Sequence, residues 1–181
     1  NNWIFPETDI DSLRRKNKID DNRLGHWFDS VVEEFPEDMG KPDAKYYQTR
    51  NELRQGIGSG QLSRTVDSPT SRLPLKELWK TYGSYTFVIS LPGHGIDCHR
   101  TWEALSLGAI VITVSTPIDE LLRPFRVVLV ERDNSEWWRE FSDPTWLEWA
   151  YKEGASGQPV DLSWEKWIDP MRNSLTIDNS V

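Results

Sequence analysis

The sequence has few of the residues that form disulfides or hold zinc. Cys98 is the only cysteine among 181 residues, so no disulfide can form within the chain. Cysteine and histidine also do not cluster at the spacing of zinc ligands. These observations argue against a fold that depends on disulfides or structural zinc. They leave the compartment open, because secreted domains of this size also occur without disulfides.

Long apolar runs and positive charge are scarce as well. No apolar run is long enough to cross a membrane, and the start does not resemble a signal peptide. The formal net charge is −8, which argues against nucleic acid or an anionic membrane as the main partner. The chain begins with asparagine, so we expect it to be processed or a fragment, and an upstream membrane anchor stays an open alternative.

Common nucleotide-binding motifs are incomplete. The dinucleotide-binding fingerprint needs a third glycine three residues after Gly95, where this chain has Cys98. No phosphate-binding loop ending in Gly-Lys-Ser or Gly-Lys-Thr occurs. One Asp-x-Asp triplet of the metal-binding kind, Asp9-Ile10-Asp11, follows no expected strand, and we interpret it as a helix start.

Three short apolar runs predict a parallel sheet. The expected strands are Tyr85–Leu91, Ala109–Ser115 and Arg126–Glu131. A helix from Cys98 to about Leu107 and a short helix over Pro117–Leu122 separate them. This βαβαβ order is typical of parallel strands joined by right-handed crossovers. We therefore predict an α/β fold, a Rossmann-like parallel sheet with flanking helices.

The chain on both sides of these strands is expected to be mostly helical. Residues 1–70 are predicted to be a polar, helical N-terminal extension, and residues 71–181 a Rossmann-like domain with C-terminal helices. Asp143-Pro144 is the expected cap and first-turn pair of a later helix. The expected helices cover Ile10–Lys18, Leu24–Glu34, Ala44–Gln55, Leu73–Tyr82, Thr145–Lys152 and Ser163–Met171, with a flexible loop at Gly56–Gly60.

Tryptophan is abundant, and six of the ten fall between Trp137 and Trp167. Aromatic faces stack well on sugars, so a glycan-contacting surface is one interpretation. However, Trp146 and Trp149 are spaced three residues apart, as are Trp164 and Trp167. That spacing is typical of helices packed on a core, and we predict packing.

The segment between the first two strands combines a turn with charged side chains. Pro92 to Gly95 cannot continue a strand, and two glycines there let a ligand approach the backbone closely. Asp97 is the expected N-cap of the following helix, whose first N–H groups attract anions. Arg100 in its first turn suits two phosphate oxygens, and Glu103 lies on the same face. A carboxylate beside a diphosphate suits ribose hydroxyls instead.

Simpler interpretations of these side chains stay open. Arg100 and Glu103 alone would more often be an ordinary surface ion pair. His94 could reach a phosphate or be solvated, and His99 could face a ligand or cap a neighbouring loop. Trp102, with the residues after it, is expected to pack the helix on the sheet.

The run Pro92-Gly93, Asp97-Cys98-His99-Arg100-Thr101-Trp102-Glu103-Ala104-Leu105 and Gly108 resembles the donor-binding part of the exostosin-like nucleotide-sugar glycosyltransferases. The similarity is close over this segment and weak elsewhere. Related enzymes usually carry a proline inside the next strand, where this chain has Val111. Valine suits a buried strand, so we expect the strand to survive.

The resemblance implies the donor half of a GT-B architecture, in which two Rossmann-like domains face each other. It implies a nucleotide sugar as donor, a glycan or glycoprotein acceptor, a possible second domain or subunit, and no metal or other cofactor. If a membrane anchor lies upstream, the protein is expected in the secretory-pathway (Golgi) lumen, and otherwise in the cytoplasm. The implied nucleotide-sugar-binding residues are Gly93, His94, Gly95, Asp97, His99, Arg100, Glu103, Ser115 and Thr116.

A rival function belongs to another class. The first 70 residues are too short and too poor in expected strands for a second Rossmann-like domain. The chain could therefore be a non-catalytic scaffold or binding subunit that keeps the fold. We lean towards an enzyme, because Arg100 and Glu103 are intact. The catalytic base, the sugar and the nucleotide base are not predicted.

Overall fold

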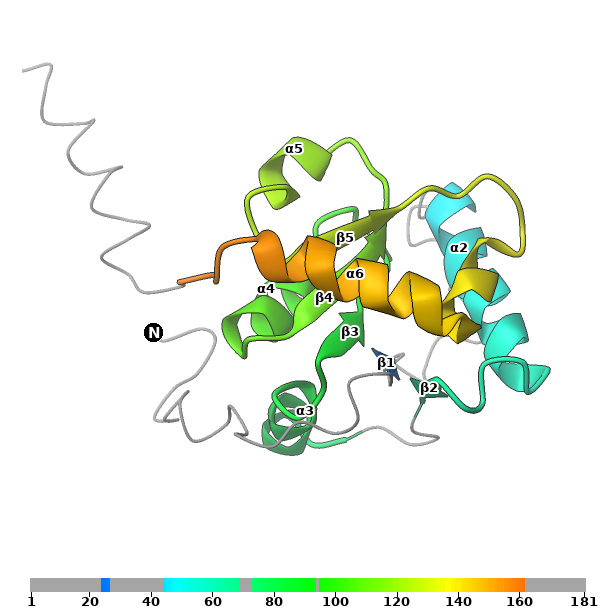
Figure 1. The fold of residues 1–181 in the computed structure, drawn as a ribbon, viewed down its shortest axis with the longest axis horizontal. Helices are drawn as coiled ribbons and strands as arrows, with labels where there is room; N and C mark the ends of the chain where they lie inside the picture. The colour runs from blue at the N-terminus through cyan, green and yellow to red at the C-terminus, as the bar shows by residue number, and fades with distance from the viewer. Residues whose placement is uncertain (1–23, 27–43, 69–72, 94, 162–181) are drawn as a thin grey trace, which may run out of the picture.

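The computed structural model describes residues 24–26, 44–68, 73–93 and 95–161 (Figure 1). The expectations for Asp9–Asp11, Ile10–Lys18, His94 and Ser163–Met171 lie outside these residues. Within the described residues, no helix has the length and apolar character needed to cross a membrane.

Five parallel strands form one sheet in the order β2-β1-β3-β4-β5. Every neighbouring pair runs parallel, with Val88 opposite Val111 and Ile112 opposite Val128. The three predicted strands are confirmed as parallel neighbours, each shorter than expected. The strands are β1 Leu24–His26, β2 Val66–Asp67, β3 Phe87–Ile89, β4 Ile110–Val114 and β5 Val127–Val130.

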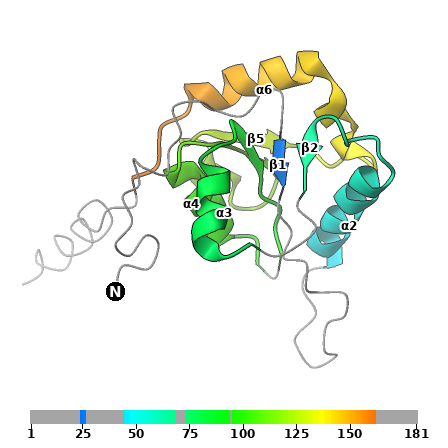
Figure 2. The same cartoon turned by 90° about the horizontal axis from the view of Figure 1, so that it is seen from below.

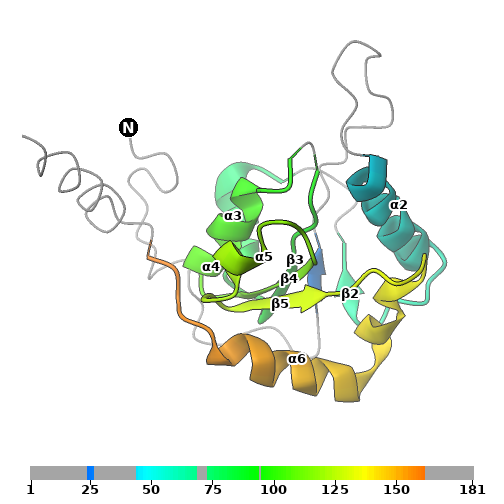
Figure 3. The same cartoon turned by 90° about the horizontal axis from the view of Figure 1, so that it is seen from above.

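Helices cover both faces of the sheet. One core cluster joins the β3–β5 side chains of one face to η1, α6 and Leu53 of α2. The other joins the opposite face to Trp79 of α3 and Leu105 of α4. Figures 2 and 3 show α6 on one side of the strands and α3 and α4 on the other. The helices are α2 Ala44–Gly58, α3 Leu75–Tyr82, α4 His99–Ser106, α5 Asp119–Leu122, the 3₁₀ helix η1 Trp137–Ser142 and α6 Pro144–Ser156.

The first 70 residues contribute strands as well as a helix. The helix expected over Leu24–Glu34 is wrong at its start, because Leu24–His26 is β1, paired with β2 on one side and β3 on the other. The helix expected over Ala44–Gln55 is confirmed and extends to Gly58. Two of the five strands therefore come from residues 1–70, for which we expected helices and no strand.

Two helix ends follow their sequence signals. Gly108, with φ of 82°, ends the α4 segment in the left-handed region that glycine tolerates. Asp143 is the N-cap of α6, and its Oδ1 accepts from the Thr145 amide at 2.8 Å. The helix then extends to Ser156, beyond the expected end at Lys152.

The strand order fixes where a ligand is expected. The connection from β1 moves outward to β2, and the chain then returns to β3 on the opposite side of β1. Open parallel sheets bind ligands outside the carboxyl ends of the strands at such a switch point. The turn after Ile89, at the end of β3, lies at this position.

Candidate functional site

The turn that follows β3 is buried and held by an arginine from α2. Pro92 and Gly93 are both buried. The Arg50 Nε donates to the Pro92 carbonyl at 2.7 Å, and its Nη2 donates to the Leu91 carbonyl at 3.1 Å. The Gly93 amide donates to the Gly95 carbonyl at 3.0 Å. The guanidinium thus fixes the backbone at the switch point.

Gly93 leaves the space that Arg50 occupies. A Cβ at position 93 would lie 2.4 Å from Arg50 Nη2 and 2.7 Å from its Cζ. A glycine is therefore needed here because the Arg50 side chain approaches the backbone closely. The expectation was that a ligand would make this approach. Sequence reasoning missed Arg50, because 42 residues separate it from Pro92 and no local pattern connects them.

The start of α4 differs from the expectation in one detail. Its N-cap is Cys98, without a side-chain cap hydrogen bond, so the prediction of Asp97 as N-cap is wrong. Asp97 Oδ1 instead accepts from the Trp102 indole Nε1 at 2.7 Å. The Asp97 carboxylate therefore binds the Trp102 indole, one turn further along the helix, and not a backbone amide at the helix start.

A buried contact ties α4 to the end of β3. The hydroxyls of Ser90 and Thr101 lie 2.9 Å apart, with Ser90 1% and Thr101 6% exposed. The Cys98 Sγ lies 3.7 Å from the Leu91 carbonyl oxygen. The Thr101 amide donates to the Cys98 carbonyl at 2.9 Å, which closes the first turn of α4.

Arg100 and Glu103 occupy the expected helix but differ in exposure. Glu103 is 9% exposed, whereas Arg100 is half-buried. A carboxylate this deep differs from the exposed partner of an ordinary surface ion pair. Packing is confirmed for Ala104, which is fully buried, and for Trp102, whose ring meets Phe125 edge-on at 5.6 Å.

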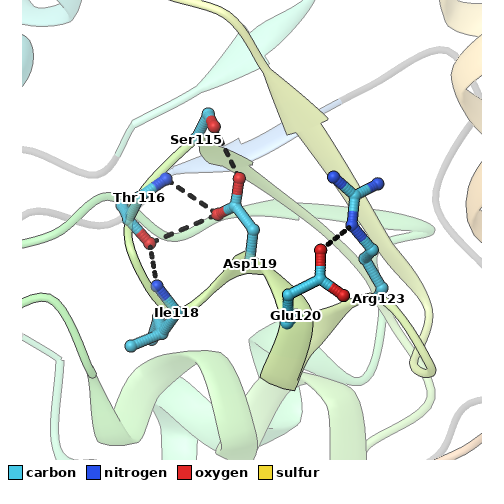
Figure 4. Close-up of polar contacts among 6 residues, drawn as sticks. All are labelled: Ser115, Thr116, Ile118, Asp119, Glu120 and Arg123. Carbon is cyan, nitrogen blue, oxygen red and sulfur yellow. Dashed lines mark hydrogen bonds and ion pairs between the residues drawn. The ribbon is translucent and has the colours of Figure 1, made fainter.

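The hydroxyls after β4 contact Asp119, the first residue of α5. The Ser115 hydroxyl donates to Asp119 Oδ2 at 2.5 Å, and the Thr116 amide donates to Asp119 Oδ1 at 2.7 Å (Figure 4). The Thr116 hydroxyl lies 3.3 Å from Asp119 Oδ1. Thr116-Pro117-Ile118-Asp119 has the residue types of a capping box, and its acid reaches back to the Thr116 amide, although the N-cap of α5 is Ile118. That pattern is the signal that could have identified Asp119 from the sequence.

A second buried charge holds α2 near the carboxyl ends of the strands. Arg132, just after β5, donates to both Glu52 oxygens, at 2.9 Å from Nε and 2.6 Å from Nη2. The Trp137 indole donates to Glu52 Oε2 at 3.0 Å. The hydrogen bonds from Arg132, aided by its charge and the indole, lower the pKa of Glu52 despite its burial.

The sequence-predicted residues lie in two adjoining groups. Gly93, Gly95, Asp97, His99, Arg100 and Glu103 belong to the β3–α4 segment, while Ser115 and Thr116 follow the neighbouring strand β4. His99 is exposed and His94 lies outside the described residues. Within the part of the chain that the structure describes, His, Cys, Asp and Glu side chains form no group of three suited to a metal.

No protein-family model matches the chain, and no curated protein is significantly similar to it in sequence.

Proposed function

We propose that the chain provides the donor site of a glycosyltransferase, which transfers a sugar from a nucleotide sugar to a glycan or protein-linked acceptor. The proposal combines the resemblance of the β3–α4 segment with its place in the fold. The observation that carries it is the location of Gly93–Arg100 at the switch point between β1 and β3.

The diphosphate would lie over the turn and the start of α4. The first amides of the helix, its positive dipole end and the Arg100 guanidinium provide complementary charge. Arg50 supports this role indirectly, because its bonds to Leu91 and Pro92 hold the turn in one conformation. A turn that is already ordered loses less entropy when a ligand binds.

The ribose would lie near Glu103. The resemblance implies this position, and a carboxylate can accept hydrogen bonds from two vicinal hydroxyls at once. In the transfer reaction, Arg100 and the helix amides would stabilise the charge that develops on the departing diphosphate. The acceptor hydroxyl needs a base if the reaction inverts the sugar configuration, and that base would come from another domain or subunit.

Calorimetry with uridine diphosphate and guanosine diphosphate tests the proposal. We expect one of them to bind the folded chain, together with any upstream domain, at millimolar concentration or below. Free phosphate serves as the control, because it lacks the ribose that Glu103 would hold. Failure of both nucleotides to bind a folded sample would favour the non-catalytic scaffold.

A further inference from the structure

A hollow of about 580 Å³ is lined by residues of the edge strand β5 and of the chain that follows it, and by none of the β3–α4 segment. Figure 3 shows the chain running from β5 through the yellow segment into α6, and the residues that line the hollow come from this stretch. Its polar lining carries four carboxylates and one guanidinium, a formal charge of −3. The lining residues are Leu129, Val130, Glu131, Asp133, Asn134, Glu136, Trp137, Arg139, Glu140, Trp146 and Trp149.

Two indoles form a fixed aromatic wall of the hollow. The rings of Trp146 and Trp149 have centroids 5.8 Å apart and meet at 52°. Trp146 rests on Phe141, which is fully buried, with centroids 5.1 Å apart. Trp149 is 48% exposed, so the expectation that it packs on the core is wrong, whereas Trp146 does pack there. The structure keeps an apolar ring open beside the carboxylates.

Three of the carboxylates are available to a ligand. Glu136 is already paired with Arg139. The side chains of Glu131, Asp133 and Glu140 are exposed and make no hydrogen bond or ion pair with other described residues. Aromatic faces next to unpaired carboxylates attract cations, because the ring quadrupole and the negative charges act in the same direction.

We propose that this hollow binds the basic side chains, arginine or lysine, of a polypeptide partner. A guanidinium stacks on the exposed Trp149 ring and donates to Glu131 or Glu140, while the partner backbone crosses the rim. The negative lining repels phosphates and nucleotides, so this site is separate from the proposed donor site and does not depend on it. A neutral sugar would stack on the ring but would leave the excess charge uncompensated.

The test uses the full chain and acetyl-Arg-Arg-Arg-amide, followed by tryptophan fluorescence and by chemical shifts of the indole N–H groups. Acetyl-Ser-Ser-Ser-amide and maltotriose are the neutral probes. We expect only the arginine peptide to bind at millimolar concentration. Raising the ionic strength from about 0.01 M to about 1 M shortens the screening length from about 30 Å to about 3 Å, so this binding should largely disappear.

Exposed side chains allow variants that leave the fold intact. Trp149→Ala should weaken peptide binding about two- to fivefold. Glu131→Gln and Glu140→Gln should each weaken it by a similar factor, roughly two- to fivefold. Glu153→Gln is the matched control, because Glu153 is exposed on α6 and does not line the hollow. It should leave the affinity unchanged.

The opposite results are equally clear. Absence of peptide binding, or binding that neither salt nor any of the three variants weakens, would overturn the proposal. Maltotriose binding that depends on Trp149 would replace it with a glycan surface. Equal losses for Glu153→Gln and Glu140→Gln would show that only the overall negative charge of the protein attracts the peptide.

Discussion

Replacing Glu52 should strongly destabilise the protein. Its side chain is 6% exposed and accepts two hydrogen bonds from Arg132, which is 19% exposed, and one from Trp137. Glu52→Ala leaves the guanidinium and the indole N–H without their partner. Breaking a buried ion pair from one side costs about 3–5 kcal/mol. Because Arg132 keeps some solvent access, we expect about 3 kcal/mol, the lower end of that range.

The assay is urea unfolding followed by tryptophan fluorescence, since Trp137 reports directly on the cluster. Glu52→Gln keeps one acceptor and most of the volume, so it should cost less than Glu52→Ala. Glu148→Gln is the control, because Glu148 makes the exposed pair with Lys152 and its loss should hardly move the midpoint. A free energy of unfolding for Glu52→Ala within about 0.5 kcal/mol of wild type would refute the reasoning.

The pH dependence gives an independent check on Glu52. Its pKa in the folded protein is lowered from 4.5. The unfolded state therefore binds a proton more readily, and the stabilisation is fully present above the unfolded pKa near 4.5. It is lost as the pH falls through the lower folded pKa. The stability advantage of wild type over Glu52→Gln should shrink below pH 4.5, and an advantage that grows in acid would contradict this sign.

Two further substitutions test the local geometry of the candidate site. Gly93→Ala should destabilise the protein by about 1–3 kcal/mol in urea unfolding, because its Cβ would meet Arg50 2.4 Å away; the matched Gly58→Ala, with open space around it, should not destabilise. Asp119→Ala should cost about 1 kcal/mol, because the Thr116 amide and the Ser115 hydroxyl lose their acceptor, whereas Asp119→Asn should cost less.

The central strands and the motif helix were predictable because their signals are local. Each of β3, β4 and β5 is a short apolar run between turn residues, and Gly108 marks the end of the α4 segment. β1 was missed because it has only three residues, Leu-Gly-His, and its strand conformation is decided by pairing with β2 and β3. Tertiary pairing overrides local preference in such short elements.

The candidate site was predictable only where it follows one continuous segment. The turn, Arg100 and Glu103 are contiguous with β3, so their placement follows from the strand–turn–helix pattern. Arg50 contacts Pro92 across 42 residues, and Arg132 contacts Glu52 across 80. No periodicity or spacing in the sequence reports such contacts. The depth of Glu103 also depends on how closely α4 packs on the sheet.

The affinity of a nucleoside diphosphate, compared with that of its free nucleoside, tests the central claim most directly. It is measured by calorimetry on wild type, Arg100→Ala and Glu103→Gln. A hydrogen bond to a charged group contributes about 1.5–3 kcal/mol, which corresponds to a factor of about ten or more in affinity. Arg100→Ala should therefore weaken diphosphate binding about tenfold or more and leave nucleoside binding nearly unchanged. Glu103→Gln should weaken both ligands by about tenfold. Equal diphosphate affinity in all three folded proteins would contradict the proposal that this segment binds the donor.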